Sequence, residues 1–360
     1  MQFNNTRDLN TDIMNIKKKL LSILLLTIAI TGAGWFALKK SSPKSENVAI
    51  RELGSTVPTQ WELSKILSGR DVLVEEGVKL ETINSIQSSG GTTTLQALLA
   101  DNIDVCTESA WPPYINIIAR GGKIKALLGI AVGTKDNEGG TQGVLVLDDS
   151  PIHTIKDLAG KRIAVNVLGA EADYVIRLFL KKNGLSISQV ELVAAPTEQH
   201  EQLLRSRQVD AAYILRVFYD LAVANGGIRQ IPGTTNFETK GESVMSALSF
   251  RNDFIEKHPD TVRKYLRAYD ASRRIIYAEF KKNPDRVKKA FADISVKKGS
   301  NPLLAKYFRA TLWTPDYPFI ADKDVQWWLD RFIEDGLLKP GQLKPSDIYT
   351  NEFNPLYKKK

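Results

Sequence analysis

The strongest constraint on the fold of this chain is a regular alternation of short apolar runs with segments of helical periodicity. It begins at Val48 and continues to about residue 250. Runs rich in β-branched residues predict strands, and apolar residues spaced three or four apart predict helices. Chains with this βαβα order fold as helices packed on sheets that are largely parallel. We therefore expect an α/β fold with mixed, mostly parallel sheets.

The predicted elements follow one another at short intervals. The predicted strands cover residues 47–53, 78–83, 103–106, 123–130, 143–147, 162–167, 190–194 and 210–214. The predicted helices between them cover residues 60–67, 93–100, 171–183, 198–205 and 217–224. Gly184 directly follows one of these helices and suits the C′ position, where a left-handed backbone ends many helices.

The character of the sequence changes after about Asn252. Four helical segments follow, and proline or glycine separates each from the next. These segments cover residues 259–282, 283–292, 302–312 and 322–335. An α/β segment followed by a helical C-terminal segment is too large for one sheet core, so we expect two lobes.

An uncharged run of 19 residues, 20–38, stands near the N-terminus directly after three lysines, 17–19. A helix of that length can cross about 30 Å of hydrocarbon, and the same pattern is typical of a secretory signal. Both interpretations stay open, an uncleaved anchor being favoured because small residues are poorly placed for cleavage. The run contains no cysteine, which excludes a lipoprotein anchor. Because basic flanks stay inside, residues 45–360 are expected to be periplasmic or extracytoplasmic, with residues 1–47 as signal or anchor plus linker.

The charge balance argues against a nucleic-acid-binding role. Lys and Arg number 49 against 41 Asp and Glu, a net charge of +8. Half of that excess lies in residues 1–47, so the body of the chain is only mildly basic. It also lacks a stripe of basic residues with interleaved aromatic residues.

Motifs of catalysis and of cofactor binding are absent from the sequence. Residues 160–162 resemble a phosphate-binding loop only in their Gly-Lys pair, since the earlier glycine and the following Ser or Thr are missing. The single cysteine, Cys106, excludes an intrachain disulfide and a thiolate cluster. Three histidines leave little for a zinc site. We expect no enzymatic activity, no metal and no cofactor.

Five segments of the chain share a pattern with one protein family. They are residues 92–106 (TTTLQALLADNIDVC), 149–165 (DSPIHTIKDLAGKRIAV), 169–193 (GAEADYVIRLFLKKNGLSISQVELV), 208–220 (QVDAAYILRVFYD) and 254–259 (FIEKHP). They resemble the periplasmic solute-binding proteins of ABC transporters for nitrate, sulfonate and taurine. The resemblance extends over roughly residues 48–290 and is most specific between 149 and 193.

This resemblance implies a type II periplasmic binding fold, in which two α/β lobes joined by two crossovers close on a ligand. The first lobe would hold residues 48–143 and 250–360, and the second residues 144–249. The implied function is that of the extracytoplasmic solute-binding component of an ABC importer, with a permease and an ATPase as partners. The implied ligand is a small organic anion such as an aliphatic sulfonate or taurine, with nitrate and a pyrimidine also open.

Two segments have the form that such a ligand site needs. In folds of this kind ligands lie at the carboxyl ends of strands, where helices begin, and helix N-termini attract small oxyanions. Residues 88–93 (SSGGTT) offer glycines and hydroxyls at one predicted helix start, where an ordinary capped loop is the alternative. Residues 169–171 stand at another. There Ala170 lacks the hydroxyl that the family often has, and Glu171 either caps the helix or faces the cleft.

Other candidate residues come from the family's ligand-facing loops. Arg216 follows a predicted strand, and its guanidinium suits a sulfonate or carboxylate, a solvated surface arginine being the alternative. Trp111 either walls the pocket or belongs to the core, and Glu108 poses the same question as Glu171. The predicted ligand-binding residues are Ser89, Gly90, Gly91, Thr92, Ser109, Trp111, Gly169, Ala170, Glu171 and Arg216.

Two other functions remain compatible with the sequence. One is a membrane-tethered domain that senses a ligand and reports it to a membrane partner. The other is an enzyme related to the synthases of the thiamine pyrimidine precursor, whose fold is similar. Those enzymes need a cysteine-rich iron motif, and Cys106 is the chain's one cysteine.

Overall fold

The structure is a computed structural model, and it describes residues 48–86, 88, 90–133, 142–310 and 319–357. The predicted anchor at 20–38, the linker up to residue 47 and the candidate residue Ser89 lie outside the described residues. Within the described part of the chain, no helix has the length and apolar character needed to span a membrane.

Ten strands and a larger set of helices are assigned within the described residues. The strands are β1 (Ile50–Leu53), β2 (Leu80–Ile83), β3 (Val105–Ala110), β4 (Ile124–Gly133), β5 (Gly143–Leu147), β6 (Arg162–Val165), β7 (Glu191–Ala194), β8 (Ala211–Ile214), β9 (Ile228–Gln230) and β10 (Ser243–Arg251). The α-helices are α2 (Gln60–Ser68), α3 (Val72–Glu75), α4 (Gly91–Leu99), α5 (Trp111–Ala119), α6 (Glu171–Lys182), α7 (His200–Arg205), α8 (Phe218–Ala224), α9 (Asn236–Lys240), α10 (Asn252–Lys257), α11 (Pro259–Lys282), α12 (Pro284–Lys297), α13 (Asp322–Glu334) and α14 (Pro345–Ile348). Short 3-10 helices are η1 (Ile155–Leu158), η2 (Ile187–Gln189), η3 (Thr197–Gln199) and η4 (Pro302–Tyr307).

The strands form three sheets. The largest has the order β7-β6-β8-β5-β9, in which β6 pairs in parallel with β7 and β8, while β5 pairs antiparallel with β8 and β9. A second sheet has the order β3-β10-β4 with antiparallel pairs only. The parallel pair β1-β2 is the third. The five-stranded sheet is thus inserted in the chain between β4 and β10, two neighbouring strands of the second sheet.

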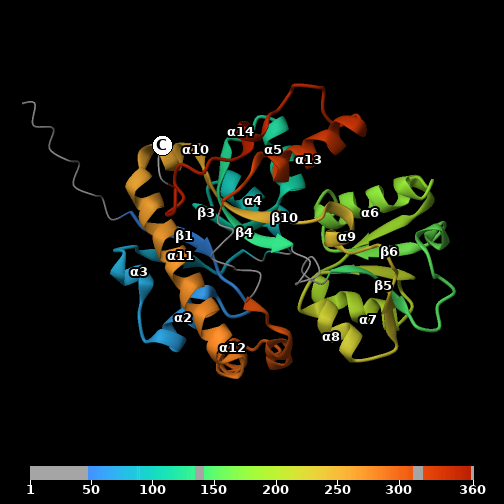
Figure 1. The fold of residues 1–360 in the computed structure, drawn as a ribbon, viewed down its shortest axis with the longest axis horizontal. Coiled ribbons are helices and arrows are strands. Elements are labelled where there is room, and N and C mark those ends of the chain that lie inside the picture. The colour runs from blue at the N-terminus through green and yellow to red at the C-terminus, as the bar shows by residue number, and fades with distance from the viewer. Residues whose placement is uncertain (1–47, 87, 89, 134–141, 311–318, 358–360) are drawn as a thin grey trace, which may run out of the picture. The chain divides into compact units, whose positions relative to one another are not determined.

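The five-stranded sheet is covered on both faces, as the alternation of its side chains requires. On β5, Val144 and Val146 belong to the core cluster shared with α6, whereas Leu145 belongs to the cluster beneath α7 and α8. Figure 1 shows α6 on one side of this sheet and α7 and α8 on the other. The sheet is therefore a buried layer, and only its ends are open to a ligand.

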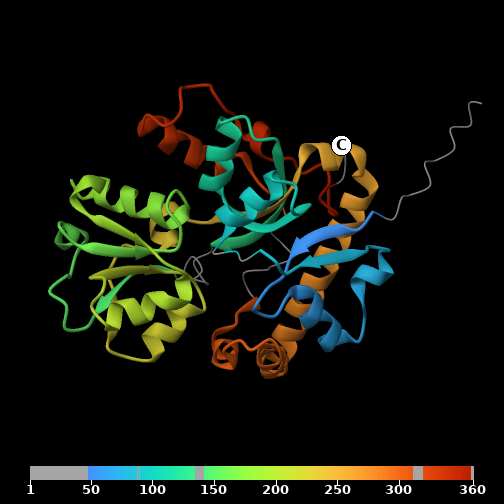
Figure 2. The ribbon, with the colours of Figure 1, turned by 180° about the vertical axis from the view of Figure 1, so that it is seen from behind.

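The second and third sheets pack against helices from distant parts of the chain. The long helix α11 shares a core cluster with β1, β4 and β10, to which Ile50, Leu128 and Phe250 contribute with Tyr265 of α11. Figure 2 shows β1 and β2 beside α11. Helix α11 thus completes the core around these strands, whereas α12 and η4 pack on α2 and α11 in a cluster to which no strand of the described chain contributes.

The predicted α/β class, the mixed sheets and the helical C-terminal segment are confirmed. Parallel pairs do not dominate as expected, since three parallel and four antiparallel pairings occur among the described strands. The difference arises because β10 and β5 each run against both of their neighbours.

The division into lobes stays a prediction, although strand pairing places β10 with β3 and β4. A boundary drawn on the sheets therefore falls before Ser243, whereas we expected residues up to 249 in the second lobe. Helix α5 was not predicted, because its sequence holds Pro112 and Pro113. Both prolines occupy the first turn, where the missing N–H groups cost no helical hydrogen bond.

Candidate functional site

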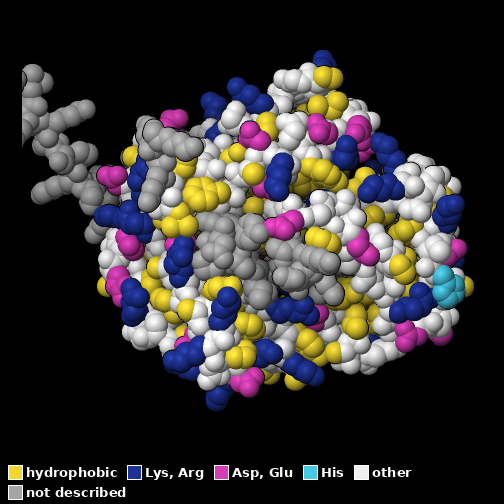
Figure 3. Space-filling view, viewed as in Figure 1, with side chains coloured by type: hydrophobic (Ala, Val, Ile, Leu, Met, Phe, Trp, Pro, Cys, Tyr) yellow, Lys and Arg dark blue, Asp and Glu magenta, His cyan; other side chains and the backbone are white. Residues whose placement is uncertain are grey.

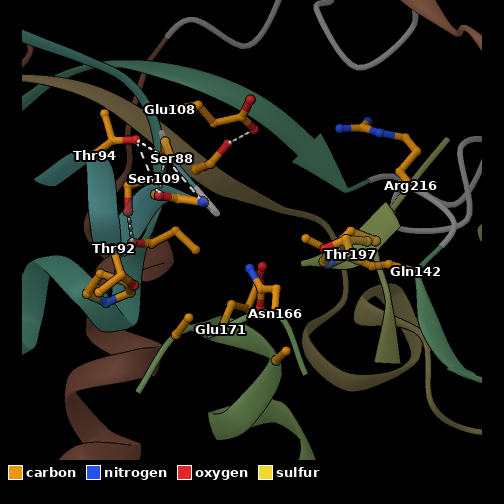
Figure 4. A pocket seen from close by; sticks show the side chains of 18 of the residues that line it. Ser88, Thr92, Thr94, Glu108, Ser109, Gln142, Asn166, Glu171, Thr197 and Arg216 are labelled. Carbon is orange, nitrogen blue, oxygen red and sulfur yellow. Dashed lines mark hydrogen bonds between the residues drawn. The ribbon is translucent and has the colours of Figure 1, made fainter. Parts of the chain in front are cut away.

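A cavity of about 420 Å³ lies where elements of the three-stranded and the five-stranded sheet meet. Its lining is mostly small and polar, and it gathers the ends of strands with the starts of helices (Figure 4). The lining residues are Ser88, Gly90, Gly91, Thr92, Thr94, Glu108, Ser109, Ala110, Pro113, Gln142, Asn166, Ala170, Glu171, Ala172, Thr197, Leu215, Arg216, Phe218 and Ser246.

The start of α4 forms one wall of the cavity. The N-cap residue of this helix is Gly90, which has no side chain to cap it, and Gly91 and Thr92 of its first turn line the cavity. Gly91 is required there, because a Cβ atom would lie 2.7 Å from the Cα of Ser109 on β3. The close packing of α4 on β3 thus brings backbone donors to the cavity.

The start of α6 forms the opposite wall, and it too lacks a side-chain cap, with Ala170 as N-cap residue. Glu171, the first helical residue, lines the cavity, and its Oε1 lies 2.9 Å from the Nζ of Lys240 on α9. The two side chains are only 14% and 4% exposed, so the pair is buried. Lys240 also lies 4.9 Å from the ring centre of Trp328 on α13. The negative charge of Glu171 is therefore balanced by a lysine from the chain itself.

Arg216 reaches the cavity from the segment that follows β8. Val217, the next residue, has φ 60° and ψ −46°, a conformation that β-branched residues rarely adopt. This strained turn precedes α8 and aims the Arg216 side chain inward. Its Nη1 is buried and has no hydrogen-bond partner among the described residues. Burial lowers the pKa of the guanidinium, while the nearby carboxylates, Glu108 first among them, oppose that shift.

Glu108, near the end of β3, faces Arg216 across the cavity. Figure 4 shows the two side chains extending toward each other from opposite sides. The Oε1 of Glu108 accepts a hydrogen bond of 2.8 Å from the hydroxyl of Ser246 on β10. No Lys or Arg of the described residues lies within ion-pair distance of this carboxylate.

Several polar side chains in the lining hold a buried atom that lacks a hydrogen-bond partner. Buried polar atoms in folded proteins are nearly always paired, so their concentration at one cavity indicates a site that a ligand or water completes. The atoms concerned are Thr92 Oγ1, Gln142 Nε2, Asn166 Oδ1 and Arg216 Nη1. Arginine and amide nitrogens donate, and a hydroxyl can donate, so the set offers mainly donors.

The structure brings most of the predicted site residues to this cavity. Seven line it, namely Gly90, Gly91, Thr92, Ser109, Ala170, Glu171 and Arg216. Trp111 does not, because it is fully buried and its indole N–H donates to the carbonyl oxygen of Val244 at 2.7 Å. Gly169 also lies outside the lining. Its N–H donates to Asp173 Oδ2 at 2.8 Å within the first turn of α6, and the residue borders a different cavity.

Residues that the sequence analysis missed make up much of the polar lining. Asn166 directly follows β6, and Thr197 begins η3 after β7. Both therefore follow strand ends, a general signal that could have identified them. Ser246 lies within β10 and reaches the cavity only because that strand pairs with β3. Gln142 precedes β5 without a local signal.

Cys106 does not line the cavity, although its Sγ lies 3.6 Å from the carbonyl oxygen of Glu108. It is fully buried on β3, and burial raises the pKa of its thiol to about 12.

The surface charges are mixed, since Figure 3 shows Lys and Arg side chains scattered among Asp and Glu across the displayed face. This agrees with the absence of a basic stripe for nucleic acid in the sequence.

Several solved structures with the same fold are binding proteins. The alkanesulfonate-binding protein SsuA from Xanthomonas axonopodis pv. citri, bound to MOPS, is 19% identical with a TM-score of 0.64, covering 84% of this chain and 98% of its own. The periplasmic nitrate-binding protein NrtA from Synechocystis PCC 6803 is 13% identical with a TM-score of 0.66, covering 86% and 87%. The desulfurization enzyme DSZB is 17% identical with a TM-score of 0.58, covering 85% and 97%. The fold is thus that of the periplasmic binding proteins, and the desulfurization enzyme DSZB shares it.

The family is established by sequence. The family model described as NMT1/THI5 like matches residues 75–287, more than half of the chain, and the chain belongs to this family. A protein of Escherichia coli (strain K12), provisionally named an aliphatic sulfonates-binding protein, is 23% identical over 185 residues. That alignment covers 51% of this chain and only 56% of the relative's length.

Proposed function

We propose that this chain is the extracytoplasmic solute-binding component of an ABC importer and delivers a small organic anion, such as an aliphatic sulfonate or taurine, to a permease. The family and the solved binding proteins of the same fold support a solute-binding role. The permease and an ATPase would be partners, and residues 20–38 would hold the protein at the inner membrane or direct its export.

One observation carries the proposal: unpartnered donors converge on a single cavity. The Nη1 of Arg216, the Nε2 of Gln142 and the hydroxyl of Thr92 are buried without partners. The starts of α4 and α6, whose N-cap residues Gly90 and Ala170 provide no capping side chain, add the positive ends of two helix dipoles. Arg216 stays protonated despite its lowered pKa, because arginine titrates far above neutral pH. Such a site stabilises an anionic group.

Binding without chemistry accounts for the site's composition. An enzyme of this fold would need a nucleophile or an acid–base pair at the cavity. The described lining contains neither cysteine nor histidine, and of its two carboxylates Glu171 is paired with Lys240 while Glu108 accepts a hydrogen bond from Ser246. Cys106 remains a thiol, because its pKa of about 12 lies far above neutral pH. The functional step would then be the closure of the three-stranded and five-stranded sheets, with their helices, around the solute.

A thermal-shift assay on the purified full-length chain tests the proposal. The panel comprises ethanesulfonate, taurine, nitrate, MOPS and a neutral pyrimidine, with sodium chloride at equal ionic strength as control. A ligand at a hundred times its Kd stabilises the protein by about 2.7 kcal/mol, which raises the unfolding temperature by several degrees. If no anion raises it while a neutral pyrimidine does, the proposed ligand class is wrong.

A further inference from the structure

The charged side chains of the cavity fall into two groups. Among the described lining residues, the charged ones are Glu108, Glu171 and Arg216. Glu171 is held by Lys240 in a buried pair, so its charge is balanced before any ligand binds. Arg216 and Glu108 each lack an opposite charge within ion-pair distance. The cavity therefore presents one positive and one negative group that the described chain does not pair.

These two groups come from different sides of the cavity. Glu108 belongs to β3 of the three-stranded sheet, and Arg216 follows β8 of the five-stranded sheet. In Figure 4 their side chains extend toward each other from the two sides of the cavity. A ligand that enters this space removes water from both, and a charged group left without a partner after losing its water is unfavourable.

The form of the ligand follows from this arrangement. A bare anion on Arg216 would leave the Glu108 carboxylate unpaired and would be repelled by it. An ammonium group attached to the anion would pair with Glu108, whose carboxylate already has one oxygen fixed by Ser246. The buried guanidinium of Arg273 also attracts the Glu108 carboxylate electrostatically. However, Arg273 does not line the cavity and forms no ion pair with Glu108 among the described residues.

We propose that the solute is a small zwitterion, in which an amine lies a few bonds from a sulfonate or carboxylate. Arg216 binds the anionic end and Glu108 binds the ammonium, while Lys240 keeps Glu171 out of that role. This inference rests on the proposed function and makes it more specific.

Matched ligands test the inference by calorimetric titration of the full-length chain. Taurine and ethanesulfonate share the sulfonate and differ at the ammonium, and β-alanine and propionate form the corresponding carboxylate pair. We expect the zwitterion of at least one pair to bind ten times more tightly than its partner anion. In Glu108→Gln that ratio should fall toward one, because the amide cannot balance an ammonium. The matched control is Glu256→Gln, which removes an exposed carboxylate on α10 and should keep the ratio.

The outcomes separate the two proposals. If the anions bind the wild-type chain as tightly as their zwitterions, or if Glu108→Gln keeps the preference, the zwitterion inference is wrong and anion binding stands. Tighter anion binding by Glu108→Gln, without any preference in the wild-type chain, would show that Glu108 only opposes the anion. If none of the four compounds binds, the proposed function fails for these ligand classes and the inference fails with it.

Discussion

The start of α6 and the end of β3 each present a carboxylate to the same cavity, but the two regions treat that charge differently. At α6, Glu171 lies beside a buried lysine brought in by α9. At β3, Glu108 has a hydroxyl for a neighbour and is exposed to the cavity. A buried charge needs a partner, and Lys240 is that partner for Glu171. At Glu108, where we propose that a ligand binds, the described chain supplies no cation within ion-pair distance.

Arg216 is the cation that we propose for the anionic end of the ligand, and its removal should have the largest effect. Arg216→Ala should weaken binding of the ligand identified by thermal shift tenfold or more, because hydrogen bonds to charged groups contribute about 1.5–3 kcal/mol. Calorimetry measures the change. Arg70→Ala is the matched control, since Arg70 is exposed on the loop before α3 and pairs with Glu75 there. Equal affinity of the wild-type and Arg216→Ala chains would remove Arg216 from the site.

Lys240→Met tests whether the α6 side depends on its internal pair. Without the lysine, the Glu171 carboxylate would face the cavity without its cation, and we expect affinity for ethanesulfonate or taurine to fall by several-fold to tenfold. Breaking a buried pair costs about 3–5 kcal/mol of stability, so the unfolding temperature should fall as well.

The double variant distinguishes charge from packing. Lys240→Met combined with Glu171→Gln removes both charges, so most of the affinity and part of the stability should return. A double variant that binds as weakly as Lys240→Met would show that Lys240 acts through its packing against Trp328. The comparison between the two carboxylates would then lose its electrostatic basis.

Local sequence signals were sufficient for part of this site. Gly90, Gly91 and Thr92 could be predicted because glycines and hydroxyls between a strand and a helix mark an open helix start. Arg216 could be predicted because it follows a short apolar strand in a segment similar to the family's ligand-facing loop. In each case the relevant neighbours lie within a few residues along the chain.

Other features depend on contacts between distant segments, which a single sequence does not reveal. Ser246 meets Glu108 across 138 positions, because β10 pairs with β3. Trp111 belongs to the core because its indole N–H finds a carbonyl oxygen 133 positions away. The partner of Glu171, Lys240, likewise comes from a helix 69 positions later. Pairing of β10 also explains why parallel strands do not dominate.

The most direct test of the account is a crystal structure of the chain grown with taurine. We expect taurine to occupy the cavity with its sulfonate oxygens about 2.7–3.2 Å from Arg216 Nη1 and Thr92 Oγ1, and with its ammonium beside Glu108. Taurine bound outside this cavity, or bound within it while Arg216 Nη1 and Thr92 Oγ1 still lack partners, would contradict the account.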